Sequence, residues 1–384
     1  MNLEGDLVVT LARDGVAVRR VDVRSTRPRV ASRILTGRTA VDVAATIPLL
    51  YSVCGGAQGA AAACALAAAG AAGFVGESAS RDTGIVLESL QEGFWHLLIG
   101  WPNTMNAEPQ ITPVTAARYL IATSTRTSGG SDLLGDARAM RELGAGLARL
   151  AERAIYAMAP DAFLELADVA ALERWCDEAK TGPARLLRQV LVDSQVPRRD
   201  DVRLLPPLSR DRVLHVIAPA LRDDPDFSGA PTWAGAPAET GALARMHQHP
   251  LVADCERRFG RTAATRIVAR MAEIARLLVE LGGAPHDVPP SPQTQSIELG
   301  NGDGVGVVET ARGVLLHRAR IHDECVVDYQ IVAPTEWNFH PEGALVHALL
   351  GAAAVDDAAM LRHARLEIHA LDPCVACKIE VAGA

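Results

Sequence analysis

The sequence predicts a mixed α/β fold in which a central helical bundle is flanked by β elements contributed by both ends of the chain. Residues 5–24 hold two apolar runs around Arg13-Asp14-Gly15, a turn signal typical of a β-hairpin. Residues 262–281 carry apolar side chains at helical spacing, which predicts a long amphipathic helix. Residues 304–329 return to short β-type runs with turns. The order is therefore β, then mostly α, then β.

The other elements follow from apolar spacing and from Gly and Pro signals. Helices are predicted at 40–50, from Gly59 onward, at 83–99 with a stop at Gly100-Trp101-Pro102, within 132–172 with a break at Pro160, and at 340–354. Irregular structure is predicted for 103–131, 197–237 and the linker 285–295, and an extended segment for 365–370. We predict a single domain, with a β-hairpin region over 1–38, a mainly helical region over 39–295, and a β-rich region with a helix and two cysteines over 296–384.

Composition excludes several classes of function. Among 384 residues, 49% are hydrophobic and 22% charged, which is ordinary for a globular protein with a large core. A net charge of −8 without a basic cluster predicts no nucleic-acid partner. The uncharged stretch Val43–Gly76 is interrupted by Pro48 and Gly55-Gly56, so we predict buried helix and no membrane insertion. Seven unevenly spaced cysteines and no N-terminal signal pattern predict a reducing, cytoplasmic location.

The sharpest local feature is Asp372-Pro373-Cys374-Val375-Ala376-Cys377. Two thiols at this spacing can face one soft metal ion or form a redox pair. A structural zinc site would need a second ligand pair nearby, and a thioredoxin-like site would need a long following helix. From spacing alone, a metal site, a redox pair and a purely structural role all stay open.

Cys54 is the second feature, in Val53-Cys54-Gly55-Gly56-Ala57-Gln58 at the junction of two helical segments. The glycines allow a backbone or a ligand to approach closely. Taken alone, a buried free cysteine that behaves as a small hydrophobe is the commoner explanation.

Six segments spread along the chain share the order and spacing of six signature segments of one enzyme family. They are Glu4-Gly5-Asp6; Leu35-Thr36-Gly37-Arg38 with Asp42, leading into Ser52–Ala57; Pro237–Arg245; Glu309–His317; Tyr329-Gln330 with Pro334–Asn338; and Asp372–Cys377. On these segments the chain resembles the large subunits of nickel–iron hydrogenases. The resemblance implies their fold, in which the two chain ends meet so that Cys54 lies near Cys374 and Cys377. Residues 103–230 match none of the signatures.

The resemblance also exposes a missing ligand. In the family, four thiolates hold nickel, and two of them bridge to an iron that carries carbonyl and cyanide. Cys54, Cys374 and Cys377 match three of these ligands and are the candidate metal ligands here, but Ala57 stands where the fourth would be. An alanine methyl cannot ligate a metal, so one bridge between the two metals is lost.

Further departures concern nickel. Ser52 replaces an arginine, Gly59–Ala61 supply no histidine where the enzymes have one, and Glu380 stands in place of the closing histidine. In the enzymes a protease cuts after that histidine once nickel is bound, whereas Ala384 follows Glu380 by four residues. We therefore expect no nickel.

Two further residues match groups that surround the cofactor in the family. Arg312 matches an arginine that lies over the diatomic ligands of the iron, and a guanidinium can donate hydrogen bonds to cyanide. Glu4 matches a glutamate that relays protons near a nickel cysteine. Arg312 and Glu4 are the candidate cofactor-binding residues, although an ion-paired arginine and a hairpin-orienting glutamate are the simpler explanations.

Within the family, the sequence is most similar to the HupK/HoxV-type hydrogenase assembly proteins. That resemblance implies a scaffold that receives an Fe(CN)2(CO) fragment from the HypC–HypD assembly proteins and passes it to a hydrogenase large-subunit precursor. We hypothesise that Cys377 holds the iron transiently, with Cys54 or Cys374 assisting, and we expect no catalytic residue.

Two other functions stay open. A divergent hydrogenase would oxidise H2 at a three-cysteine site, but Ala57 and Glu380 argue against it. A metal-free structural or regulatory relative, like the respiratory complex I subunit of this fold, would have no need of the intact Asp372–Cys377 motif.

Overall fold

The computed structural model describes residues 5–27, 30–51, 54–76, 78–125, 133–194, 202–283 and 293–382. The chain divides into two compact units. The first contains Met1–Arg81, Asp201–Ala244 and Pro292–Ala384, and the second contains Asp82–Asp200 and Arg245–Ser291. The helical region predicted over 39–295 is thus shared between them, and the single domain stays a prediction.

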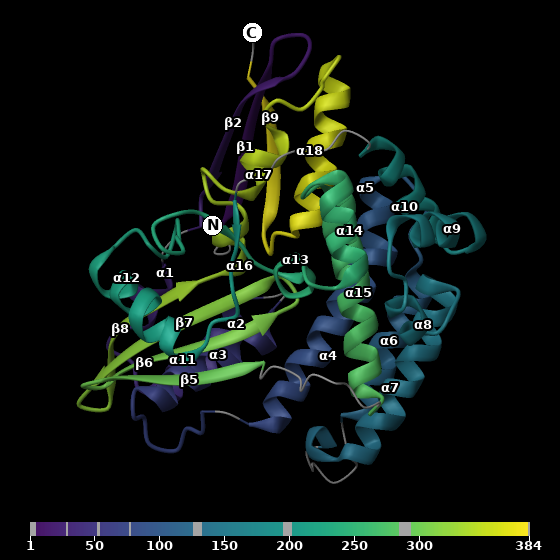
Figure 1. The fold of residues 1–384 in the computed structure, drawn as a ribbon. Coiled ribbons are helices and arrows are strands. Elements are labelled where there is room, and N and C mark those ends of the chain that lie inside the picture. The colour runs from purple at the N-terminus through teal and green to yellow at the C-terminus, as the bar shows by residue number, and fades with distance from the viewer. Residues whose placement is uncertain are drawn as a thin grey trace. The chain divides into compact units, whose positions relative to one another are not determined.

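A three-stranded sheet in the first unit joins the two ends of the chain (Figure 1). Strands β1 (Asp6–Arg13) and β2 (Val18–Ser25) form the predicted hairpin, with a bulge after Ala12. Strand β9 (Ala376–Val381) pairs parallel to β1, with Leu7 opposite Cys377. The prediction that β elements from both termini meet is therefore confirmed.

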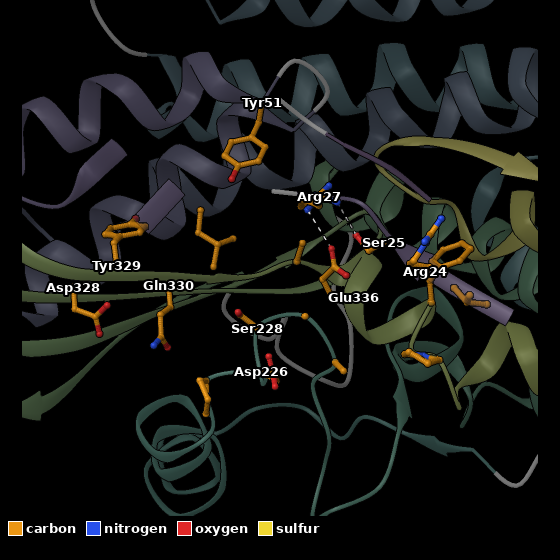
Figure 2. A pocket seen from close by; sticks show the side chains of 18 residues that line it. Arg24, Ser25, Arg27, Tyr51, Asp226, Ser228, Asp328, Tyr329, Gln330 and Glu336 are labelled. Carbon is orange, nitrogen blue, oxygen red and sulfur yellow. Dashed lines mark hydrogen bonds and ion pairs between the residues drawn. The ribbon is translucent and has the colours of Figure 1, made fainter. Parts of the chain in front are cut away.

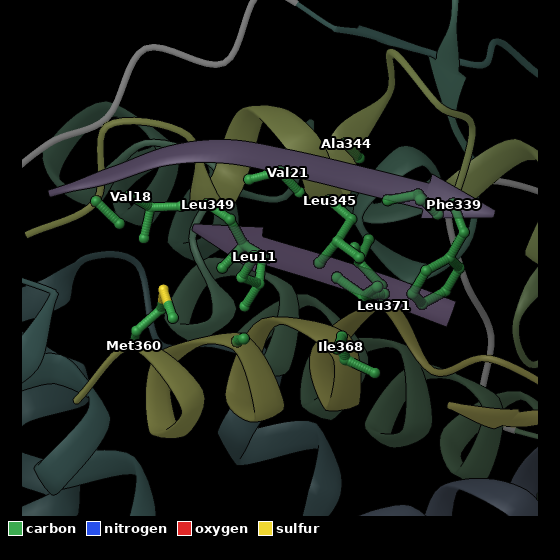
Figure 3. Close-up of a cluster of buried hydrophobic side chains, with 14 of the residues drawn as sticks. Leu11, Val18, Val21, Phe339, Ala344, Leu345, Leu349, Met360, Ile368 and Leu371 are labelled. Carbon is green, nitrogen blue, oxygen red and sulfur yellow. The ribbon is translucent and has the colours of Figure 1, made fainter. Parts of the chain in front are cut away.

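Helices α17 (Ala344–Leu349) and α18 (Asp357–Leu371) supply the core beside this sheet. Buried side chains of the hairpin, such as Leu11 and Val21, meet Leu345 and Ile368 from the helices in one hydrophobic cluster (Figure 3). The cluster removes a continuous apolar surface from water, which is the main favourable contribution to folding.

Helix α18 corrects the expectation of an extended segment at 365–370. Leu366, Ile368 and Ala370 alternate with polar residues, which resembles a strand pattern. Asp356 decides against it, because its carboxylate accepts a hydrogen bond from the Ala359 amide and caps the helix. The strand that carries the last cysteine is β9, five residues further on.

A four-stranded antiparallel meander forms the second sheet of this unit. Its strands are β5 (Thr294–Gly300), β6 (Asp303–Thr310), β7 (Gly313–His322) and β8 (Cys325–Val332). The first of them begins inside the predicted linker, whose residues 285–292 lie outside the described residues.

Helix α3 (Gly55–Ala68) packs directly on this meander, and this contact accounts for the alanine tract. A Cβ atom at Gly306 would lie 2.2 Å from the Ala61 carbonyl oxygen, and one at Gly304 would lie 2.4 Å from the Ala68 carbonyl carbon. Only small residues on both elements permit so close an approach of the two backbones. The helix begins at Gly55, four residues before the predicted start.

The remaining elements of the first unit are short, apart from the predicted helix α2. They are α1 (Val30–Leu35), α2 (Ala40–Leu50), β3 (Arg203–Leu204), α11 (Arg210–Arg212), α12 (Ala218–Asp223), β4 (Ala238–Glu239) and α16 (Pro334–Asn338). A π-helical turn at Val213–Ile217 makes 210–223 continuously helical, so the irregular structure expected over 197–237 is wrong there. The helix expected at 340–354 is likewise limited to α17.

The second unit is helical. Its helices are α4 (Ala79–Trp95), α5 (Trp101–Thr104), α6 (Ile111–Ser124), α7 (Ala137–Ala151), α8 (Pro160–Leu164), α9 (Val169–Glu178), α10 (Gly182–Asp193), α14 (Pro250–Phe259) and α15 (Ala263–Leu281), with α13 (Ala242–Met246) at the border between the units. Helix α15 confirms the predicted amphipathic helix and is buried along most of its length.

Two predictions fail in this unit. The loop expected over 103–131 contains helix α6, where the Thr115 and Thr123 hydroxyls donate to carbonyls one turn earlier and do not disrupt the helix. The stop expected at Gly100-Trp101-Pro102 is also wrong, because a π-helical turn at His96–Gly100 connects α4 to α5, and Pro102 lies within α5. Over the described ranges, no helix is long and apolar enough to cross a membrane.

Candidate functional site

Three of the signature segments are interlocked by the side chains of Asn338 and Thr240. The Asn338 Oδ1 atom accepts a hydrogen bond from the Thr240 amide at 2.9 Å, and its Nδ2 donates to the Arg312 carbonyl at 3.3 Å. The Thr240 Oγ1 atom accepts from the Val314 amide at 3.0 Å. Gly313 (φ 127°) is required here, since a Cβ atom would lie 2.4 Å from Thr240 Cγ2.

Arg312 connects these three interlocked segments to the C-terminal motif Asp372–Cys377. Its Nε atom lies 3.4 Å from Asp372 Oδ2, and both side chains are buried. Asp372 ends α18 in a left-handed conformation (φ 53°) and so turns the chain toward Pro373 and Cys374. The structure therefore places Arg312 at the predicted motif, where an ion pair orients it, and a contact with an iron ligand stays a prediction.

Cys374 lies in a polar setting. The Arg27 guanidinium donates to its sulfur at 2.8 Å, and the Thr335 hydroxyl lies 3.1 Å from the same sulfur. The Cys374 amide donates to the Thr335 oxygen at 3.1 Å, which leaves the hydroxyl proton available to the sulfur. Two hydrogen-bond donors are thus directed at this sulfur.

Arg27 forms an ion pair with Glu336 at 3.8 Å as well. Burial by itself would lower the pKa of Arg27, but the neighbouring Cys374 and Glu336 raise that pKa above its ordinary value. The side chain is thus a permanent, partly buried cation. Thr335 belongs to a signature segment, whereas Arg27 lies in none, and no sequence signal marked it.

Cys377 lies in a different environment. Its strand position, opposite Leu7, directs the side chain with Val375 and Ile379 against the hydrophobic cluster of the hairpin, α17 and α18. Burial raises the pKa of the Cys377 thiol to about 11. The neutral thiol is therefore the stable form at this site.

Cys54 stands at the start of α3 and is reached by a chain of buried polar groups. The Gln58 Nε2 atom lies 3.7 Å from its sulfur, Gln58 Oε1 lies 2.9 Å from His317 Nε2, and His317 Nδ1 lies 2.7 Å from the Tyr329 hydroxyl. Burial lowers the pKa of His317 to about 3 and raises that of Tyr329, so both groups are neutral.

Neutral groups leave one consistent direction of donation along this chain. Tyr329 donates to His317 Nδ1, His317 Nε2–H donates to the Gln58 carbonyl, and the Gln58 amide donates to Cys54. Gln58 thereby supplies a hydrogen-bond donor to Cys54. It lies in α3, where the histidine of the related enzymes is absent. His317 closes the signature segment that begins at Glu309, so a signal for it existed, but its partner Gln58 carried none.

A cavity of about 550 Å³ is bordered by residues from both polar groups. It is lined by Arg27 and Glu336 from the Cys374 group and by Tyr329 from the Cys54 group, together with Tyr51 and Ser228. Figure 2 shows Arg27 and Glu336 side by side, with Tyr51 and Tyr329 on other sides of the space. Its volume falls in the range of small-molecule sites, roughly 300–1,000 Å³.

The predicted metal ligands do not form one cluster among the described residues. Within the part of the chain that the structure describes, no three His, Cys, Asp or Glu side chains come close enough to hold a metal ion. Joint binding by Cys54, Cys374 and Cys377 therefore stays a prediction. Glu4 lies outside the described residues, and Ala57 is fully buried within α3.

The fold is that of nickel–iron–selenium hydrogenases. The reduced enzyme from Desulfovibrio vulgaris Hildenborough matches with a TM-score of 0.54 over 94% of both chains at 18% identity. The reduced, active enzyme from Desulfomicrobium baculatum gives the same TM-score, coverage and identity. A family model described as nickel-dependent hydrogenase matches residues 245–380. These likenesses define a protein of the hydrogenase-fold class.

Within this class, the chain is similar over its whole length to hydrogenase expression/formation proteins. It is 31% identical to HoxV of Cupriavidus necator, over 93% of this chain and 91% of the relative. It is 30% identical to HupK of Azotobacter vinelandii, over 97% and 96%. The chain belongs to this HoxV/HupK family, as the sequence motifs predicted.

Proposed function

We propose that this chain is a non-catalytic maturation scaffold that carries an Fe(CN)2(CO) fragment to a nickel–iron hydrogenase large-subunit precursor. HypC–HypD-type assembly proteins would supply the fragment, and the carrier would act in the cytoplasm. The relatives' names, hydrogenase expression/formation proteins, support a role in making a hydrogenase.

The observation that carries the proposal is the setting of Cys374. Its sulfur is held by Arg27 and Thr335, and Arg27 borders the cavity. A sulfur held by a partly buried cation that itself lines a cavity suits a soft metal fragment with hydrogen-bond-accepting ligands. The position of the fourth nickel ligand is taken by the buried Ala57. Loss of that thiolate supports transient iron binding without nickel.

Which cysteine binds the iron is the finer question. The sequence favours Cys377, but its thiol packs against the hydrophobic cluster, and binding would have to expose and deprotonate it. The contacts of Cys374 favour that residue as the first ligand, with Cys377 or Cys54 joining afterwards.

The test is infrared spectroscopy on protein co-expressed with the assembly proteins, together with iron and nickel analysis. We expect cyanide and carbonyl stretches and iron without nickel, and loss of both bands and iron in Cys374→Ala. The matched control is Cys325→Ala, a half-buried free cysteine outside the site, which should keep the bands. On incubation with a large-subunit precursor, the bands should move to that protein.

Other outcomes would contradict the proposal. Protein without bands and without iron would indicate a metal-free structural or regulatory role. Bands with stoichiometric nickel and H2-dependent dye reduction would indicate a divergent hydrogenase.

A further inference from the structure

We infer that Arg27 binds the cyanide ligands of the iron cargo and that the cavity beside it is where the cargo enters. This inference rests on the proposed function and adds a cargo-binding residue that lies outside all the signature segments. Its basis is the position of one guanidinium, which contacts the Cys374 sulfur and also lines the cavity.

The chemistry of the side chain fits this task. A guanidinium presents five N–H donors in a planar fork, so one side chain can contact several acceptors at the same time. Cyanide bound to iron accepts hydrogen bonds at its nitrogen, and donation from a cation makes such bonds strong. An iron bound to the Cys374 sulfur would therefore have its diatomic ligands within reach of the group that already touches that sulfur.

The backbone of Arg27 is held in place by the start of the hairpin. The Thr26 amide donates to the Asp6 carbonyl at 2.8 Å, and the Asp6 amide donates to Thr26 Oγ1 at 2.9 Å. Gly5 (φ 70°) lies against the same segment, where a Cβ atom would be 2.4 Å from Arg27 Cα. The pairing of Asp6 with Ala376 then sets this segment beside the cysteine motif. Arg27 is thus positioned before any cargo arrives, which lowers the entropic cost of binding.

Arg312, the arginine expected from the sequence to face the iron, has a different position. Its guanidinium is directed to Asp372, and it does not line the cavity. Cargo in the cavity would contact Arg27 and Glu336, which line it. Arg312 then orients the motif, while Arg27 contacts the cargo.

The test compares Arg27→Gln and Arg27→Lys with the control Arg20→Gln, an exposed arginine on the same hairpin. All are co-expressed with the assembly proteins and examined for iron content, infrared bands and melting temperature. We expect Arg27→Gln to hold roughly 10- to 100-fold less iron, because a charged hydrogen bond is lost. Arg20→Gln should resemble the wild type.

The Arg27→Lys variant separates recognition from folding. It keeps the charge but loses the planar fork, so we expect iron to be retained with displaced cyanide bands and a carbonyl band near its original position. Wild-type iron content in Arg27→Gln, or unshifted cyanide bands in Arg27→Lys, would overturn the inference and leave the scaffold proposal standing. Wild-type protein without any bands would instead overturn the scaffold proposal.

Discussion

Cys374 and Cys377 are three residues apart in one motif, yet their environments are opposite. Cys374 lies in the turn after α18, where Arg27 and Thr335 surround its sulfur. Cys377 lies in β9, opposite Leu7, where its side chain joins an apolar cluster. The difference teaches that a CxxC spacing does not make two equivalent ligands, because the electrostatic environment depends on neighbours that are distant in sequence.

The comparison can be tested most sharply by thiol reactivity. Because burial raises the pKa of Cys377 to about 11, its thiolate fraction at pH 8 should be about 100-fold below that of an ordinary thiol. In iron-free protein, we expect iodoacetamide to modify Cys377 about 100-fold more slowly than free cysteine, and more slowly than Cys374, whose sulfur lies among polar groups. A time course followed by peptide fragmentation and mass spectrometry distinguishes the two positions. Equal rates would show that the two environments are alike.

The same substitution at both positions should have unequal effects on stability. Cys374→Val would leave the Arg27 guanidinium and the Thr335 hydroxyl facing a methyl group, at a cost of about 1–3 kcal/mol. Cys377→Val replaces one small apolar group by another and should cost less than about 1.5 kcal/mol. Urea denaturation of the two iron-free variants measures the difference, and a larger loss at Cys377 would refute it.

Thr335 tests the polar side of the comparison. Thr335→Val keeps the shape but removes the acceptor of the Cys374 amide and the hydroxyl beside its sulfur, and should destabilise the protein by about 1–2 kcal/mol. Thr335→Ser keeps the hydroxyl and is the matched control, which should recover most of that stability. The measurement is the melting temperature of each variant. Identical melting temperatures for Thr335→Val and Thr335→Ser would contradict a stabilising role of these hydrogen bonds.

The third cysteine extends the comparison to a neutral network. Because burial lowers the pKa of His317 to about 3, the unfolded chain binds a proton below pH 6.5 that the folded chain does not, so stability falls as the pH decreases from 6.5 toward 3. This one residue should remove about 1 kcal/mol between pH 6.5 and pH 5.5.

The variant His317→Gln should lose this part of the pH dependence. His322→Gln, at a largely exposed histidine, is the control and should keep it. Denaturation midpoints at the two pH values measure the effect. The same pH dependence in both variants would mean that His317 is not held neutral.

Much of the fold could be predicted because its signals are local. The Asp14-Gly15 turn and the apolar spacing of α15 specify their elements within a few residues of sequence. Elements whose stability comes from packing were missed. Helix α18 shows a strand-like alternation, and β9 is a short segment whose partner β1 lies at the other end of the chain.

The candidate site divides in the same way. Signature segments pointed to Cys54, Cys374, Cys377 and Arg312, and the structure links the last of these to the C-terminal motif. The groups that contact the sulfurs were found only in three dimensions. Arg27 and Gln58 occupy positions without a signal, and they act through partners hundreds of residues away.

By itself, the sequence determined the set of cysteines, the alanine in place of the fourth ligand, and the family. Only the tertiary structure decided which sulfur lies beside a cation and which packs against the hydrophobic cluster. The physical reason is that charge and burial act through space. Arg27 reaches Cys374 across 347 positions of sequence, because β9 pairs with β1 and brings the last strand beside the first.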